Sequence, residues 1–304
     1  MVSRSAQALL DLVADAAPLD TQSVERNRAG TAEAVGLTGE PAPVHEVFDT
    51  QVAGVPVRVY RPTEKPGSPA VAFFHGGGWV LGDLEIADTT ARDLAVFSQA
   101  VVVSVDYRLA PEHPFPAAAD DALAVTRALL DGVSGLGIDP ERVAVAGDSA
   151  GGNLAAVTAL ALRRHPRALR HQALIYPVTQ ASVGATASYR EYGEGFLLRA
   201  RDMQWSFDQY APGADPADPR LAPLAAPDLH GAAATTMILA ECDPVRDEGA
   251  AYAERLREAG VPVEVREFPG QIHTFLYYAG VVPEAVEARR TIGQALGAAL
   301  GTLT

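Results

Sequence analysis

The chain has 304 residues, of which 48% are hydrophobic, so it is long enough to bury a large core in one α/β domain with additions. Its formal net charge of −14 at pH 7, with no local run of Lys or Arg, argues against nucleic acid and anionic membranes as partners. The single cysteine, Cys242, excludes an internal disulfide, and we interpret it as a small buried hydrophobic residue.

Residues 1–40 precede the first predicted strand and contain two predicted helices. The apolar positions of residues 1–18 follow a helical spacing, but Asp11 and Asp15 interrupt them, so no export signal is visible. No apolar stretch of the chain reaches the roughly 20 residues that span a bilayer. We therefore expect a soluble, cytoplasmic protein.

Eight strands are predicted after residue 40. Glu46–Val52 and the alternating apolar run that begins at Val55 resemble an antiparallel edge pair. Six short apolar runs follow, at Ala70–Phe74, Val101–Val105, Arg142–Ala146, Gln172–Tyr176, Thr236–Ala240 and Val261–Phe268. Helical segments lie between several of them, at Ala117–Leu130, Ala150–Arg163 and Asp247–Ala259. This alternation predicts an α/β fold with a mostly parallel eight-stranded sheet covered by helices.

The connection between Pro177 and Ala233 is much longer than the others. It contains a predicted helix at Ala200–Tyr210 and a Pro-, Ala- and Asp-rich stretch at Ala211–Pro227. Long connections of this kind often cover an active site. We expect residues 1–40 and an insertion at about 183–228 to form one helical cap.

The insertion contains apolar residues that could form one face of a helix, and this face has two possible roles. Leu198, Met203 and Trp205 have a spacing that places them on one side of a helix, either over a substrate site or packed against the body of the protein. We assign Leu198 and Trp205, together with Trp79, to a substrate pocket.

The run Gly147-Asp148-Ser149-Ala150-Gly151 lies between a predicted strand and a predicted helix. A serine on such a strained turn needs small neighbours, and its hydroxyl is then exposed as a nucleophile. By itself the run also fits a glycine-rich loop in which Ser149 caps the helix.

A serine nucleophile requires a histidine base and an acid that orients it. Asp243 and His273 each follow a predicted strand, and they come after Ser149 in the chain order expected for this fold class. His113 lies among prolines and is better explained by a rigid loop. We place the remaining histidines, His45, His165, His171 and His230, on the surface or in loops.

His75-Gly76-Gly77-Gly78 follows another predicted strand. The N–H groups of Gly77 and Gly78, joined by that of Ala150, are candidate donors to a developing oxyanion. The alternative is a dinucleotide site, because Gly76, Gly78 and Gly82 nearly match G-x-G-x-x-G and Asp106 resembles a ribose-binding acid. However, the last glycine interval is one residue too long, and apolar residues 79–81 would have to open a phosphate-facing helix.

These motifs together resemble the bacterial hormone-sensitive-lipase-like carboxylesterases of the α/β-hydrolase fold. The matching segments occur in the family's order, at His75–Trp79, Asp106–Glu112, Gly147–Asn153, Asp243–Gly249 and His273–Phe275. Two departures are Trp79, where Phe is common, and Thr274, where Gly often follows the histidine.

The resemblance implies a serine esterase that cleaves short- to medium-chain carboxylic esters without a cofactor or metal. It carries the nucleophile, acid and base onto Ser149, Asp243 and His273, and gives His75 the role of shaping the oxyanion loop. It implies a catalytic domain at 41–304 and a homodimer formed through an edge strand. The family also includes the plant gibberellin receptor, which has lost the catalytic histidine, and the presence of His273 favours an enzyme.

Overall fold

The computed structural model describes residues 1–303, and the strands in this range form one eight-stranded sheet. The strands are β1 (Glu46–Val52), β2 (Val55–Arg61), β3 (Ser68–Phe74), β4 (Val101–Val105), β5 (Ile138–Asp148), β6 (Gln172–Ile175), β7 (Thr235–Cys242) and β8 (Val263–Ile272). Their spatial order is β1-β2-β4-β3-β5-β6-β7-β8. Only β2 runs antiparallel to its neighbours β1 and β4, so the predicted antiparallel edge and mostly parallel sheet are confirmed.

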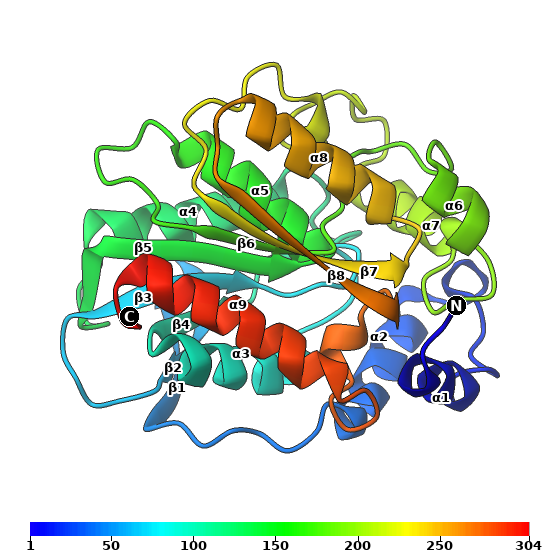
Figure 1. Ribbon diagram of the computed structural model, residues 1–304, viewed down its shortest axis with the longest axis horizontal. Coiled ribbons are helices and arrows are strands. Elements are labelled where there is room, and N and C mark those ends of the chain that lie inside the picture. Colours follow the sequence, from blue (N-terminus) through cyan, green and yellow to red (C-terminus); the bar gives the residue numbers. More distant parts are fainter. Residues whose placement is uncertain (304) are drawn as a thin grey trace.

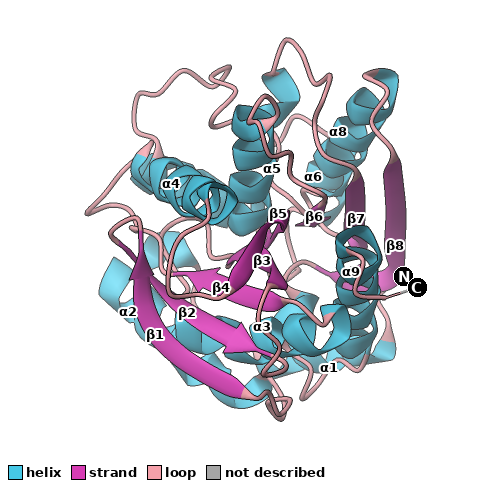
Figure 2. Ribbon diagram, turned by 90° about the vertical axis from the view of Figure 1, so that its left-hand side faces the viewer, coloured by secondary structure: helices cyan, strands magenta, loops and turns pink. Residues whose placement is uncertain are grey.

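Helices cover both faces of the sheet (Figures 1 and 2). On one face lie α4 (Ala117–Asp131), α5 (Ala150–Leu162) and α8 (Arg246–Glu258), which match the predicted helices to within one residue. On the other face lie α3 (Leu84–Ser98) and α9 (Glu284–Leu300), which the sequence pattern did not single out. Neighbouring residues of β3 serve both layers, because Phe73 belongs to one buried cluster and Phe74 to the other.

Two further helical regions lie beside one another near the carboxyl ends of the parallel strands (Figure 1). The N-terminal region contains α1 (Arg4–Leu12), α2 (Val24–Glu33) and the 3₁₀ turns η1 (Leu19–Thr21) and η2 (Ala34–Leu37). The connection between β6 and β7 contains α6 (Ala187–Tyr192), α7 (Ala200–Tyr210) and η3 (Pro223–Ala225), and η4 (Phe275–Tyr277) follows β8. The turns that end the strands therefore face these two regions.

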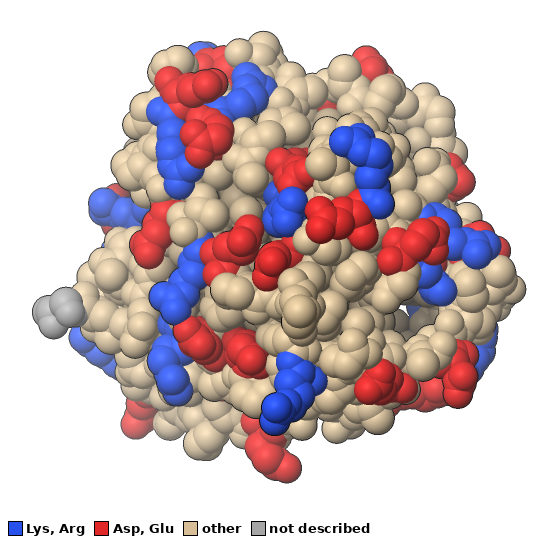
Figure 3. Space-filling model, turned by 45° about the vertical axis from the view of Figure 1, so that its right-hand side comes forward, with Lys and Arg blue, Asp and Glu red and all other residues tan. Residues whose placement is uncertain are grey.

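Two features concern contacts with charged partners and with lipid bilayers. Acidic and basic side chains are interspersed over the face drawn in Figure 3. None of the helices in the described chain combines the length and apolarity needed to span a lipid bilayer.

Candidate active site

Ser149 occupies a sharp turn between β5 and α5. Its backbone has φ 54° and ψ −117°, a conformation that side-chain-bearing residues rarely adopt. A Cβ atom placed on Gly151 would lie 2.0 Å from the carbonyl oxygen of Phe74, so that position accepts only glycine. The predicted strand-to-helix turn at Ser149 is therefore present, and its glycine has a steric reason.

The structure brings Ser149, His273 and Asp243 into one hydrogen-bonded row. His273 Nε2 lies 2.8 Å from Ser149 Oγ, and His273 Nδ1 lies 2.6 Å from Asp243 Oδ2. The other oxygen of Asp243 accepts a hydrogen bond of 2.9 Å from the N–H of Val245, and all three side chains are buried. An Nδ1–H donated to Asp243 leaves Nε2 free to accept the serine hydrogen, which is the arrangement that activates a hydroxyl.

Gly77 and Gly78 form the turn after β3 and line the cavity that contains Ser149. Both have positive φ, at 118° and 60°, and a Cβ atom on Gly77 would lie 2.1 Å from the carbonyl oxygen of Leu81. Ala150 is the first residue of α5, and N–H groups in the first turn of a helix have no partner within the helix. Gly77 and Gly78 therefore line the same cavity as Ser149, and Ala150 directly follows Ser149 in the chain.

A buried hydrogen-bond junction connects three of the turns around the cavity. The N–H of Gly76 donates to Asp148 Oδ1 and to Tyr277 Oη, each at 2.9 Å, and the Tyr277 hydroxyl donates to the same carboxyl oxygen. Burial raises the pKa of Asp148 to about 7. Arg289 of α9 supports this junction, because its guanidinium donates hydrogen bonds to the backbone carbonyl oxygens of Leu276 and Tyr277.

No sequence motif singles out Tyr277. The residue lies four positions after His273 in an aromatic run, and its partner Asp148 is 129 positions away. Asp148 was visible only as a member of the serine motif. The junction depends on contacts between residues that are far apart in the chain, so neither local spacing nor residue type indicates it.

His75 is fully buried beside the glycine turn. Its ring stacks on Tyr107 with 4.4 Å between centroids, and its Nδ1 lies 2.7 Å from the carbonyl oxygen of Gly76. Burial lowers the pKa of this histidine, so the neutral ring is favoured. These contacts agree with a part in shaping the loop.

The cavity above Ser149 has a volume of about 220 Å³. Its lower part comes from the turns after the strands, including Gly77, Gly78 and His273. Its upper part comes from the N-terminal region and the connection between β6 and β7, through Leu19, Thr31, Leu197, Leu198, Met203 and Ser206. The two helical regions therefore jointly cover the serine.

The assignment of Trp79 and Trp205 to the substrate pocket was wrong. Neither Trp79 nor Trp205 is among the described residues that line this cavity. Trp79 is fully buried and stacks on Tyr210 with 4.5 Å between ring centroids, while Trp205 packs in the hydrophobic cluster of the body. On a helix, side chains two residues apart point about 160° away from each other, so Trp205 does not share the cavity-facing side of Met203. Of the expected apolar face, Leu198 and Met203 reach the cavity.

The dinucleotide alternative does not fit the turn before α3. In a dinucleotide fold the pyrophosphate binds the free N–H groups at the start of this helix. Here the Asp83 carboxylate occupies them, accepting hydrogen bonds from Glu85 at 3.0 Å and Ile86 at 2.9 Å. A carboxylate in that position would repel a phosphate.

Cys242 and His171 are both buried. Cys242 is 1% exposed, as expected for a small buried residue, and burial raises the pKa of its thiol. His171 was expected in a surface segment or loop but is buried just before β6, with Nε2 2.9 Å from Thr236 Oγ1. Its burial lowers the pKa to about 4, so it packs as a neutral ring.

A family model described as the alpha/beta hydrolase fold matches residues 71–277 of the chain. The chain belongs to this family. The model that the chain matches is that of the hormone-sensitive-lipase-like group, as the sequence motifs indicated. Among curated proteins it is 41% identical to an ethyl acetate hydrolase of Pseudomonas putida, over 86% of this chain and 84% of the relative. It is 45% identical to the carboxylesterase NlhH of Mycobacterium tuberculosis, over 77% of this chain and 75% of the relative.

Solved structures agree with this placement. An ester hydrolase from the metagenome of Lake Arreo, complexed with a derivative of bipyridine phosphonate, superposes with a TM-score of 0.95 and 38% identity, covering 99% of this chain and 100% of its own. A hyperthermophilic esterase from the archaeon Pyrobaculum calidifontis gives a TM-score of 0.92 at 38% identity, covering 98% of both chains. The chain is therefore a carboxylic ester hydrolase of this family.

Proposed function

We propose that this hydrolase cleaves short- to medium-chain carboxylic esters through an acyl-enzyme formed on Ser149. The observation that carries the proposal is the buried row of hydrogen bonds from Ser149 through His273 to Asp243. A serine hydroxyl is a weak nucleophile until a base accepts its proton, and this row supplies the base and its orienting acid.

In the acylation step, Ser149 Oγ attacks the ester carbonyl carbon while its proton passes to His273 Nε2. Asp243 stabilises the resulting imidazolium, whose Nδ1–H it accepts at 2.6 Å. The carbonyl oxygen becomes an oxyanion, for which the N–H groups of Gly77, Gly78 and Ala150 are the proposed donors. When the carbon–oxygen bond breaks, His273 returns the proton to the leaving alkoxide.

In the deacylation step, a water molecule replaces the alcohol. His273 accepts a proton from this water as it attacks the acyl carbon, and the same backbone donors stabilise the second oxyanion. Collapse of that intermediate breaks the bond to Ser149, which recovers its proton, and releases the carboxylic acid. The cycle uses only groups of this chain, the ester and water.

The size and lining of the cavity support small esters. Its volume of about 220 Å³ is below the roughly 300–1,000 Å³ typical of sites for drug-sized ligands. Leucine and methionine side chains form much of its upper wall, which suits an alkyl group. This upper wall corresponds to the proposed cap, residues 1–40 with the insertion at about 183–228. The similarity to an ethyl acetate hydrolase favours the same size range.

The proposal is tested by three variants measured on p-nitrophenyl acetate, butanoate, hexanoate and octanoate. Ser149→Ala and His273→Ala should each lower kcat by about 10⁴- to 10⁶-fold, and the double variant should lose little more, because the residues act as one unit. Unchanged unfolding temperatures would serve as the control for folding. Losses that multiply in the double variant, or a Ser149→Ala enzyme with near wild-type rates, would contradict the proposed mechanism.

A further inference from the structure

The upper wall of the cavity is assembled from two segments far apart in the chain. We call the turn η1, the helix α2 and residues 197–206 the roof. Leu19 of η1 and Met203 of α7 both line the cavity above Ser149. The position of Leu19 relative to α7 therefore helps to determine how much of an ester fits.

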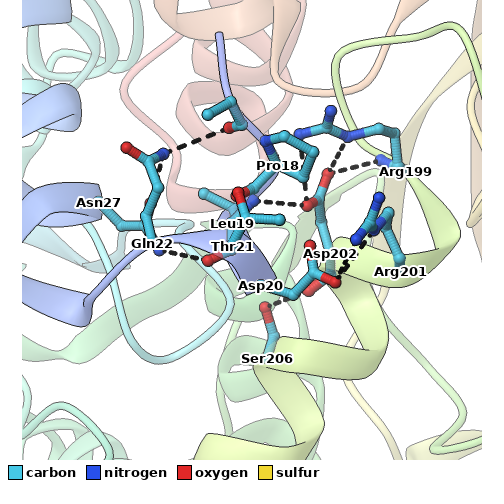
Figure 4. A network of polar contacts seen from close by, with 11 residues as sticks. Pro18, Leu19, Asp20, Thr21, Gln22, Asn27, Arg199, Arg201, Asp202 and Ser206 are labelled. Atoms are coloured by element: carbon cyan, nitrogen blue, oxygen red, sulfur yellow. Dashed lines mark hydrogen bonds and ion pairs between the residues drawn. The ribbon is translucent and has the colours of Figure 1, made fainter.

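Buried side chains hold the backbone of Leu19 from both sides (Figure 4). The Leu19 N–H donates to Asp202 Oδ1 at 3.0 Å, and the Leu19 carbonyl oxygen accepts from Asn27 Nδ2 at 2.9 Å. Asp202 is 2% exposed and Asn27 is 4% exposed, so water does not compete easily for these bonds.

Asp202 lies in the first turn of α7, where its carboxylate makes further hydrogen bonds. Its carboxylate also accepts hydrogen bonds from the backbone N–H of Arg199 at 3.2 Å and from Arg199 Nε at 2.7 Å. Its charge is therefore balanced inside the roof. The more exposed ion pair between Arg201 and Asp20 lies beside it and does not touch the backbone of Leu19.

The helix α2 ties the same turn to the body of the protein. Arg28 donates to the carbonyl oxygen of Val80 at 3.0 Å and to that of Ala110 at 2.9 Å, and it forms an ion pair with Glu112. Val80 lies two residues after Gly78, so α2 is fixed relative to the turn that borders the cavity. Leu19 is thus held against α7 on one side and, through Asn27 and Arg28, against the body on the other.

We propose that Leu19 is a specificity-determining residue that limits the chain length of the ester group beneath α7, and that Asp202 and Asn27 are its positioning residues. This inference rests on the proposed ester cleavage at Ser149. Truncation of Leu19 enlarges the cavity directly. Truncation of Asp202 removes no cavity-lining atom of its own, but it releases the turn that carries Leu19.

The test measures kcat/KM on two ester series. One is the p-nitrophenyl series from acetate to octanoate, and the other consists of ethyl, butyl, hexyl and octyl acetates. In Leu19→Ala the ratio of the longest to the shortest substrate should rise by about tenfold in one series, which also identifies the group that lies beneath α7. Asp202→Ala should raise the same ratio in the same series, and adding it to Leu19→Ala should have little further effect.

Two matched controls separate this effect from general loosening. Leu12→Ala removes an exposed leucine of the N-terminal region, and Asp208→Ala removes an exposed aspartate of α7. Both should leave the ratio within about twofold of wild type, because neither changes the cavity or its supports. Asn27→Ala should instead shift the ratio as Asp202→Ala does.

A different result would overturn each part of the proposal. A Leu19→Ala enzyme with wild-type ratios in both series would contradict the role of Leu19. Asp202→Ala and Asn27→Ala variants that lose stability but keep the wild-type ratio would contradict the positioning. A wild-type chain that cleaves neither series, or a Ser149→Ala variant that cleaves them at the wild-type rate, would overturn the proposed function together with the inference.

Discussion

Buried hydrogen bonds hold both the floor of the cavity and its roof, but only the floor is also confined by close backbone contacts at glycines. The floor consists of the turns that carry Gly77, Ser149, Asp243 and His273, and backbone sterics and buried hydrogen bonds confine it. The roof, as defined above, depends on bonds such as the one from the Leu19 N–H to Asp202. We infer that changes in the floor act on the rate of chemistry, whereas changes at the roof residues that line the cavity, or at the side chains that position them, act on which esters fit.

The largest effect on stability is expected within α7, where one substitution separates packing from selectivity. Trp205 packs into the hydrophobic cluster of the body, so Trp205→Ala should lower the free energy of unfolding by about 3–5 kcal/mol. Because Trp205 does not line the cavity, the chain-length ratio should stay within about twofold of wild type. Urea unfolding and the p-nitrophenyl series measure the two quantities.

Met203→Ala is the matched variant two residues earlier on the same helix. Met203 lines the cavity, so this substitution should shift the chain-length ratio by about tenfold. A shift for Trp205→Ala without one for Met203→Ala would contradict this description of the roof.

A smaller effect is expected in the floor, from the carboxyl group of Asp148. Burial raises its pKa to about 7, whereas an aspartate in an unfolded chain has a pKa of about 3.9. Between these values the folded protein holds a proton that the unfolded chain has released, so this group makes stability fall as pH rises from about 4 to 7. Asn is neutral throughout, so Asp148→Asn should be more stable relative to wild type at pH 7 than at pH 4.5, by an amount on the order of a few kcal/mol.

Urea unfolding of both proteins across this pH range measures the effect. Asp208→Asn, at an exposed position of α7, is the control and should follow the wild-type curve. Parallel stability curves for Asp148→Asn and wild type would show that the buried carboxyl does not carry this pH dependence.

The floor could be predicted from the sequence because each of its parts is local. A glycine two residues after Ser149, or a pair of glycines after β3, reflects a steric requirement within a few residues of the turn itself. The chain order of Ser149, Asp243 and His273 then follows from the order of parallel strands, whose carboxyl ends lie at one edge of the sheet.

The roof and the supports of the floor could not be predicted in this way. Leu19 and Asp202 are 183 residues apart, and nothing local to either residue indicates the contact. The assignment of Trp205 failed because apolar spacing alone does not say which side of α7 faces a cavity. The helix α9 was missed because glycines within its span weaken a helical pattern, although tertiary packing stabilises the helix.

Covalent labelling shows directly whether Ser149 is the nucleophile. The wild-type chain should react with a p-nitrophenyl alkylphosphonate, lose activity in step with the release of one equivalent of nitrophenol, and carry the phosphonyl group on the peptide that contains Ser149. Ser149→Ala should remain unlabelled, and His273→Ala should label far more slowly, because its serine lacks a base. Stoichiometric inactivation with the label on any other residue would show that Ser149 is not the nucleophile.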